Sequence, residues 1–287
     1  MELFHHLKVS LGVPITLTKL LEIEGLDLSK IRLVRHHKSN TRERSPWDLW
    51  QRQDGSFELY QRIQNPRKFD RASLLLSFVM TPDKRTLFVG AYEVAGKSTV
   101  PKGMRCPLSG KDSAGRDLYD LRPSHVLKSY SGRLVIDWGP PTQQWVHLVH
   151  TDEEKAKQIT ELWRDEFDPP FPGFIDFTGR LSELATLTPR WCDALSSVRG
   201  IYLLRCETTG EQYVGSAYGE DGFLGRWNGY ATTGHGGNKR MLEREESDYI
   251  VTILEVSSST ATVDEIIRRE SIWKEKLGSR EFGMNAN

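Results

Sequence analysis

The 287-residue sequence is poor in cysteine and has no long hydrophobic run. Its three cysteines, Cys106, Cys192 and Cys206, are far apart and form no CxxC pair. This argues against a zinc knuckle or a disulfide framework. No apolar stretch approaches the ~18 residues that a membrane-spanning helix needs. Internal repeats and low-complexity tracts are also missing, which leaves a globular protein with 38% hydrophobic and 27% charged residues.

A net charge is absent as well, because 39 Lys and Arg residues balance 39 Asp and Glu residues. The distribution is uneven, since residues 1–150 hold 23 basic and 15 acidic side chains. A basic front half is consistent with contacts to phosphates. The first 25 residues alternate apolar with charged side chains, unlike a signal or transit peptide. We therefore expect a cytoplasmic protein without membrane attachment.

The pattern of residues 1–150 predicts a β-rich domain. Short β-branched or aromatic runs bounded by Gly, Pro, Asp and Asn indicate strands. They lie at 32–37, 56–63, 86–94 and 132–138. One helix is expected near 69–79.

Residues 151–196 are predicted as a helical connector. Residues 152–167 have helical spacing of apolar side chains, with acidic residues in the first turn. The stretch "DPPFPGF" at 168–174 holds three prolines and one glycine, which predicts a linker. Two short helices are then expected at 181–187 and 189–198.

Residues 197–287 predict a small α/β domain around a three-stranded sheet. The expected strands are 201–206, 212–216 and 249–256, and the expected helices are about 223–231, 239–246 and 263–277. The whole chain is therefore assigned to the α+β class.

Glu270 lies in the middle of an apolar stripe on the last predicted helix. At about 100° per residue, its apolar neighbours on that face are Val263, Ile266, Ile267, Trp273 and Leu277. Burying an unpaired carboxylate costs several kcal/mol. Glu270 is therefore expected to meet a metal ion or another cation. The simpler alternative is an internal salt bridge, for instance to Arg226.

Arg226 and Tyr230 are four residues apart in "GFLGRWNGYA" and share one face of a predicted helix. A guanidinium and a phenol that point the same way suit a phosphate. The alternative for Arg226 is an ordinary solvated arginine.

Two tripeptides complete a pattern that resembles the GIY-YIG endonuclease superfamily over about residues 199–287. "GIY" stands at 200–202 and "YVG" at 213–215, with ten residues between them. Arg226, Tyr230 and Glu270 follow in order, and Asn285 comes fifteen residues after the glutamate. Val214 stands where the family name has isoleucine. The alternative, an ordinary β-hairpin with core tyrosines, does not account for the full set.

The resemblance implies a metal-dependent endonuclease that acts on double-stranded DNA. It implies that Glu270 anchors one divalent ion, Mg²⁺ or Mn²⁺, and that Arg226 holds the scissile phosphate. Tyr202 is implied as the general base on the attacking water. Tyr213 and Tyr230 are implied to orient water and phosphate.

Asn285 is implied to form hydrogen bonds near the metal or to shape the pocket. His235 in "TTGHGGNKRM" is a further catalytic candidate, with a simple loop histidine as the alternative. Lys239 and Arg240 are candidates for phosphate contacts, or for solvated side chains. Cutting both strands of a duplex requires two active sites or two successive nicks, so a homodimer is one expected arrangement.

The basic front half is the expected DNA-recognition domain. Its candidate phosphate contacts in "RLVRHHKSNTRER" are Arg35, His36, Lys38, Arg42 and Arg44, and a solvated loop is the alternative. Trp47 and Trp50 in "RSPWDLW" are expected to be exposed and to stack on an extruded base. The alternative is that they pack against the barrel.

The strand rhythm around "LFVGAYEV" resembles PUA-like modules, some of which read modified bases. That resemblance implies a PUA-like barrel and a modification-dependent restriction enzyme of bacterial phage defence, the modified base being a cytosine. A structure-specific or repair nuclease of the same fold is the alternative enzyme. A catalytically silent nucleic-acid-binding protein is the alternative from another class.

Overall fold

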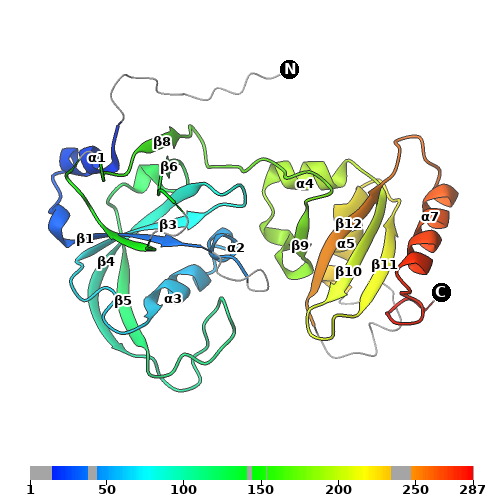
Figure 1. Cartoon of the computed structure of the whole chain (residues 1–287), viewed down its shortest axis with the longest axis horizontal. Helices are drawn as coiled ribbons and strands as arrows, with labels where there is room; N and C mark the ends of the chain where they lie inside the picture. The colour runs from blue at the N-terminus through cyan, green and yellow to red at the C-terminus, as the bar shows by residue number, and fades with distance from the viewer. Residues whose placement is uncertain (1–14, 38–43, 141–143, 153, 234–246, 287) are drawn as a thin grey trace. The chain divides into compact units, whose positions relative to one another are not determined.

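The computed structural model describes residues 15–37, 44–140, 144–152, 154–233 and 247–286. The chain separates into two compact units, Met1–Phe167 and Asp168–Asn287. Each unit has its own sheet and hydrophobic core (Figure 1). No helix in the described part of the chain is long and apolar enough to cross a membrane.

The N-terminal unit is built around one curled eight-stranded sheet. Six of its strands follow the order β2-β5-β4-β3-β1-β7, while β6 pairs with β4 and β8. The strands are β1 (Ile31–His36), β2 (Ile63–Gln64), β3 (Leu74–Met80), β4 (Thr86–Thr99), β5 (Asp117–Ser124), β6 (Leu134–Ile136), β7 (Val146–Leu148) and β8 (Ile159–Leu162). Its helices are α1 (Leu17–Ile23), α2 (Pro46–Gln51) and α3 (Ser56–Arg62), with short 3₁₀ turns at Leu28–Lys30 and Lys128–Tyr130.

Three sequence predictions in this unit are wrong. Residues 56–63 were expected as a strand but form helix α3, whose buried residues Phe57 and Gln61 are one helical turn apart. Residues 69–79 were expected as a helix, but strand β3 occupies most of that stretch. A continuous apolar run fits a buried helix and a central strand equally well, and β3 is buried along almost all of its length.

The third wrong prediction is the helix at 152–167. This segment contains β8, which pairs with β6. Its apolar side chains pack into different places, since Ile159 contacts one hydrophobic cluster while Trp163 and Phe167 contact another. Their helical spacing in sequence therefore does not correspond to one helix face. The predicted strands at 32–37, 86–94 and 132–138 are confirmed as β1, β4 and β6.

The C-terminal unit has a four-stranded sheet in the order β11-β10-β12-β9. Its strands are β9 (Thr178–Arg180), β10 (Gly200–Cys206), β11 (Gln212–Ala217) and β12 (Tyr249–Val256). Its helices are α4 (Pro189–Ser196), α5 (Gly222–Thr233) and α7 (Val263–Lys276), with a 3₁₀ helix at Leu181–Thr186. The three predicted strands are confirmed, and β9 is a fourth strand that the sequence pattern did not reveal. The predicted helix at 239–246 lies outside the described residues.

Helix α7 packs on one face of this sheet, and helices α4 and α5 pack on the other. Ile201 and Val214 contact Ile266 of α7. Tyr202 and Leu204, which alternate with Ile201 along β10, join the cluster around α5. The residues expected as a linker contribute here too, because Phe171 and Phe174 pack against that second cluster.

Candidate active site

The two glycines of the tripeptides allow close approaches that no other residue permits. A Cβ on Gly200 would collide with the backbone oxygen of Glu255 on the neighbouring strand. A Cβ on Gly215 would collide with the hydroxyl end of Tyr202, its cross-strand partner. Gly215 thus provides the space in which the Tyr202 phenol lies against β11.

The Tyr202 phenol is part of a compact cluster with α5. Its hydroxyl donates a hydrogen bond to the Tyr230 hydroxyl at 3.0 Å. Arg226 donates from Nε to the Tyr202 hydroxyl at 3.2 Å and from Nη2 to the Tyr230 hydroxyl at 3.3 Å. Both phenols are buried, whereas Arg226 is exposed. The guanidinium is therefore held by two phenols and still presents a face to solvent.

Burial shapes the acid–base properties of these tyrosines. It raises the pKa of Tyr202 well above its usual range, although the charge of Arg226 opposes the shift. Burial and the neighbouring Tyr202 likewise raise the pKa of Tyr230. Both phenols therefore carry their protons at neutral pH.

Tyr213 lies on β11, an edge strand of the sheet, and packs against the cluster around α5. Its ring centroid lies 6.1 Å from that of Tyr230. Burial, then Tyr230, then the charge of Glu270 raise the pKa of Tyr213. Tyr213 is thus within electrostatic range of Glu270 as well as of Arg226. Tyr213 is therefore the residue whose pKa is influenced both by Arg226 of α5 and by Glu270 of α7.

Glu270 lies on the sheet-facing side of α7, as expected, and both of its carboxylate oxygens have partners. Oε1 is 2.7 Å from Nζ of Lys274. Oε2 accepts a hydrogen bond from the hydroxyl of Ser216. The cation beside Glu270 is therefore Lys274, while the guanidinium of Arg226 donates to the two phenols.

Sequence analysis missed both Ser216 and Lys274. Ser216 is two residues beyond Val214, so it points from β11 toward the same helix. Lys274 is four residues beyond Glu270, the spacing at which side chains meet on a helix. These two spacings were the signals that were available in the sequence.

The expected apolar stripe around Glu270 is only partly correct. Ile266 is fully buried, and Trp273 and Leu277 pack against the same cluster. Val263 and Ile267, however, are 42% and 43% exposed. The buried stripe is narrower than expected because it follows the i, i+4, i+7, i+8, i+11 positions that begin at Ile266.

Asn285 fastens the C-terminal segment to β11. Its Oδ1 accepts a hydrogen bond from the backbone N–H of Val214 at 2.9 Å, and its Nδ2 donates to the Val214 carbonyl at 2.8 Å. It is buried. Asn285 therefore fixes the strand between Tyr213 and Gly215. The other candidates that the sequence indicated in this unit, His235, Lys239 and Arg240, lie outside the described residues.

The donors around Glu270 fit one hard divalent cation. The oxygen donors are a carboxylate beside a hydroxyl, the ammonium of Lys274 bonds to one carboxylate oxygen, and the Glu270 side chain is 14% exposed, so water reaches it. Mg²⁺ keeps several waters and takes one or two carboxylates. In the described part of the chain, no group of three or more His, Cys, Asp or Glu side chains is arranged to hold a metal ion. A cage that surrounds the ion with protein ligands is therefore not formed by these residues.

Residues 198–285 match the family model of the GIY-YIG catalytic domain. The C-terminal unit carries a GIY-YIG catalytic domain. Such a domain implies nuclease activity on nucleic acid, with DNA as the substrate. GIY-YIG nucleases typically use divalent metal ions. Comparison with curated proteins and with solved structures gave no match.

Outside the GIY-YIG domain, the two tryptophans expected to be exposed are not. A Ser45 capping box starts helix α2, which turns Trp47 into the core, where it is 5% exposed. Trp50 packs against the same cluster with its ring centroid 5.4 Å from that of Trp47. The expectation of an exposed stacking pair is therefore wrong, and packing in the core was the correct alternative.

The basic residues of the expected recognition stretch lie in different settings. Arg35 is 6% exposed, and its guanidinium carbon is 5.1 Å from the ring centroid of Trp138. His36 is also buried, and burial lowers its pKa to about 3. Arg44 lies just before Ser45, the N-cap of α2, and is half-buried, while Lys38 and Arg42 lie outside the described residues.

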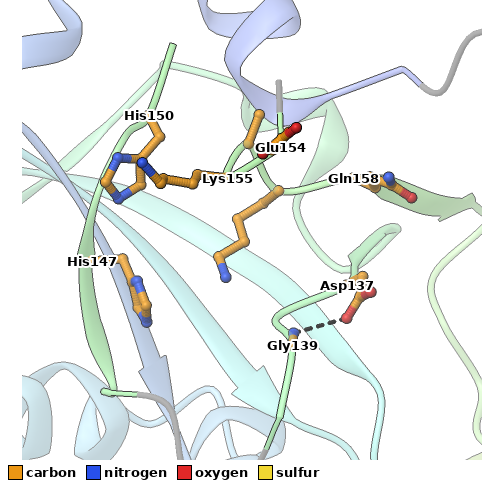
Figure 2. Close-up of a pocket in the computed structure, with 9 residues that line it drawn as sticks. Asp137, Gly139, His147, His150, Glu154, Lys155 and Gln158 are labelled. Carbon is orange, nitrogen blue, oxygen red and sulfur yellow. Dashed lines mark hydrogen bonds between the residues drawn. The ribbon is translucent and has the colours of Figure 1, made fainter. Parts of the chain in front are cut away.

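The N-terminal unit also contains a cavity of about 310 Å³ (Figure 2). His147 and His150 lie on one side of it, with Asp137 and Gly139 opposite. The remaining lining residues are Glu154, Lys155, Ala156, Lys157 and Gln158. Acidic and basic side chains are mixed in this lining, so the charges alone do not favour a ligand of either sign.

Proposed function

We propose that the protein is a metal-dependent endonuclease that hydrolyses phosphodiester bonds in double-stranded DNA. The observation that carries this proposal is that Arg226 bonds to Tyr202, and Glu270 bonds to Ser216 of β11, within one GIY-YIG domain. Hydrolysis of a phosphodiester needs a positioned water and stabilisation of charge on the phosphate. These residues offer groups for both tasks.

Arg226 is assigned to the scissile phosphate. Two of its nitrogens are fixed by phenol hydroxyls, while the side chain stays exposed to solvent. A guanidinium that is fixed before substrate arrives loses little freedom on binding and matches phosphate geometry. We expect this preorganisation to stabilise the charge that develops on the phosphate oxygens.

Tyr202 is assigned to the attacking water. Its phenol is protonated at neutral pH, because burial raises its pKa. The phenol oxygen accepts a hydrogen bond from Arg226 and donates its proton toward Tyr230. A protonated phenol cannot take a proton from the water, so Tyr202 acts as the base only after it has lost its own proton, and the charge of Arg226 stabilises that phenolate. We propose that Tyr213 and Tyr230 complete the shape of this water and phosphate site.

Glu270 is assigned to the divalent ion, which we propose to be Mg²⁺, with Mn²⁺ as the alternative. When bound, such an ion supplies charge neutralisation at the phosphate and at the departing oxygen. Ser216 and Lys274 hold the carboxylate in one orientation.

The N-terminal unit is proposed to select the DNA target, with restriction of foreign DNA in bacterial defence as the use. The excess of basic residues in 1–150 supports DNA contact. Digestion of matched duplexes tests whether cleavage requires a modified target base. The duplexes carry cytosine, methylcytosine, hydroxymethylcytosine or glucosylated cytosine. Equal cleavage of all four would contradict modification dependence.

The experiment that tests the nuclease assignment compares Glu270→Gln with Glu275→Gln on supercoiled plasmid and Mg²⁺. Glu275 is an exposed carboxylate on the same helix, so it is the matched control. We expect Glu270→Gln to reduce nicking by about 10²-fold or more and Glu275→Gln to leave it unchanged. Cleavage by Glu270→Gln at the wild-type rate would refute the assignment.

A further inference from the structure

Lys274 is an unusual neighbour for a proposed metal ligand. Its side chain is only 4% exposed, and its ammonium is 2.7 Å from Glu270 Oε1. Exposed i, i+4 ion pairs on helices contribute little, but this pair is on the buried stripe that begins at Ile266. Burying a lysine costs free energy unless a counter-charge faces it. Glu270 is that counter-charge.

The charge of Glu270 is therefore already compensated by Lys274 before any ion arrives. Arg226 is a further positive charge in this domain, and it acts on Tyr213 as Glu270 does. A divalent ion placed on Glu270 would add two more positive charges close to the ammonium. Like charges at such short range repel strongly at the dielectric of a protein surface. Without DNA, the protein is thus expected to bind the ion weakly.

A phosphate group changes this balance. A phosphodiester brings one negative charge to the side of Arg226 and Glu270, and its oxygens are ligands that Mg²⁺ prefers. The ion then gains an oxygen ligand at the same time as its charge is offset. By thermodynamic linkage, an ion that binds better with DNA present also makes DNA bind better, by the same factor.

We propose that Lys274 is a positioning residue that makes divalent-ion binding depend on the DNA phosphate. It holds the Glu270 carboxylate in place and keeps the affinity for the ion low until DNA is bound. The inference deepens the proposed nuclease function and rests on it. A merely structural lysine predicts the opposite result, since its removal would disturb Glu270 and weaken ion binding.

The test measures Mn²⁺ binding to the full chain without DNA by electron paramagnetic resonance. Lys274→Met is expected to bind Mn²⁺ about tenfold more tightly than the wild type, because one of two competing positive charges is gone. Lys276→Met is the matched control, an exposed lysine two residues away, and is expected to match the wild type. The double variant Lys274→Met with Glu270→Gln is expected to lose the tighter Mn²⁺ binding, because the carboxylate that holds the ion is gone. Unchanged or weaker Mn²⁺ binding by Lys274→Met would overturn the proposal.

A second measurement tests whether ion binding and DNA binding strengthen each other. The affinity of the full chain for a short duplex is measured with EDTA or with Ca²⁺ at equal ionic strength. The wild type is expected to gain affinity with the ion, and Lys274→Met is expected to gain at least threefold less. An equal gain in both proteins would overturn the coupling. Should Lys274→Met fail to fold, Lys274→Gln removes the same charge and takes its place in both measurements.

The outcome is separable from that of the nuclease proposal. If the wild type does not cut DNA, the proposed function fails whatever the Mn²⁺-binding measurements show. If the wild type cuts DNA and Lys274→Met binds Mn²⁺ no more tightly, only the role of Lys274 fails.

Discussion

The two units each hold an arginine against an aromatic ring, at almost the same distance. The guanidinium carbon of Arg226 is 5.0 Å from the ring centroid of Tyr230, and that of Arg35 is 5.1 Å from the ring centroid of Trp138. The surroundings differ in every other respect. Arg226 is exposed and donates to two phenols, whereas Arg35 is 6% exposed and its Nε finds no hydrogen-bond partner among the residues that the structure describes.

The difference shows that contact with a ring does not define what an arginine does. Arg226 has fixed donors and an open face, which is what a phosphate-binding group requires. Among the residues that the structure describes, no carboxylate forms an ion pair with Arg35, and burial lowers its pKa. A backbone phosphate at the protein surface does not reach such a buried group. Arg35 is therefore a less suitable phosphate contact than the sequence indicated.

The sharpest test of this comparison is the loss of Arg226. We expect Arg226→Ala to reduce the rate of DNA cleavage by about 10²–10³-fold, because a preorganised positive group at the phosphate is removed. The rate is measured under single-turnover conditions on plasmid DNA. Arg122→Ala, on an exposed residue of β5 in the other unit, is the control. A change of less than threefold would contradict the role of Arg226.

A smaller effect is expected at Asn285, which fixes the strand that carries Tyr213 into the surroundings of Arg226. Asn285→Ala leaves the buried N–H and C=O of Val214 without their partners. We expect a loss of about 1–3 kcal/mol in the free energy of unfolding. Chemical denaturation measures it. An unchanged midpoint would mean that water replaces the amide.

The smallest effect, and the one with the opposite sign, is expected at Arg35. Arg35→Met keeps an unbranched side chain against Trp138 and removes a buried charge without an ion-pair partner. We expect the free energy of unfolding to rise by about 1 kcal/mol. Thermal or chemical unfolding of the full chain tests this. A marked destabilisation would show that neighbouring groups compensate the charge of Arg35, and would remove the contrast with Arg226.

Sequence analysis located β10, β11, β12, α5 and α7 of the C-terminal unit, though not β9, because the pattern of these elements is local. Fixed spacings join the tripeptides to Arg226, Glu270 and Asn285, and short strands between polar turns frame them. In the N-terminal unit the same method found β1, β4 and β6 but assigned three other segments wrongly, for physical reasons. The run at 74–79 is apolar on both faces, so periodicity could not separate a strand from a helix.

The missing parts of the site also have a physical explanation. Lys274 is a charged residue on a buried stripe, and its burial becomes understandable only when Glu270 is known to be its partner. Ser216 bonds to Glu270 of α7 because its side chain points to the same face of the sheet as that of Val214. This contact can be predicted only when it is known which face of the sheet α7 covers. The sequence analysis did not predict helix α2 with its Ser45 capping box, which turns Trp47 inward, and therefore expected Trp47 to be exposed.

The two hydrogen bonds between Asn285 and Val214 have a consequence for the behaviour of the protein in solution. β11 is the outermost strand of its sheet, and unpaired backbone groups on such a strand invite another chain to add itself there. The Asn285 amide occupies both backbone groups of Val214, and the Met284 N–H donates to the Gln212 carbonyl. The strand that carries the catalytic candidates is thereby shielded from edge-to-edge aggregation.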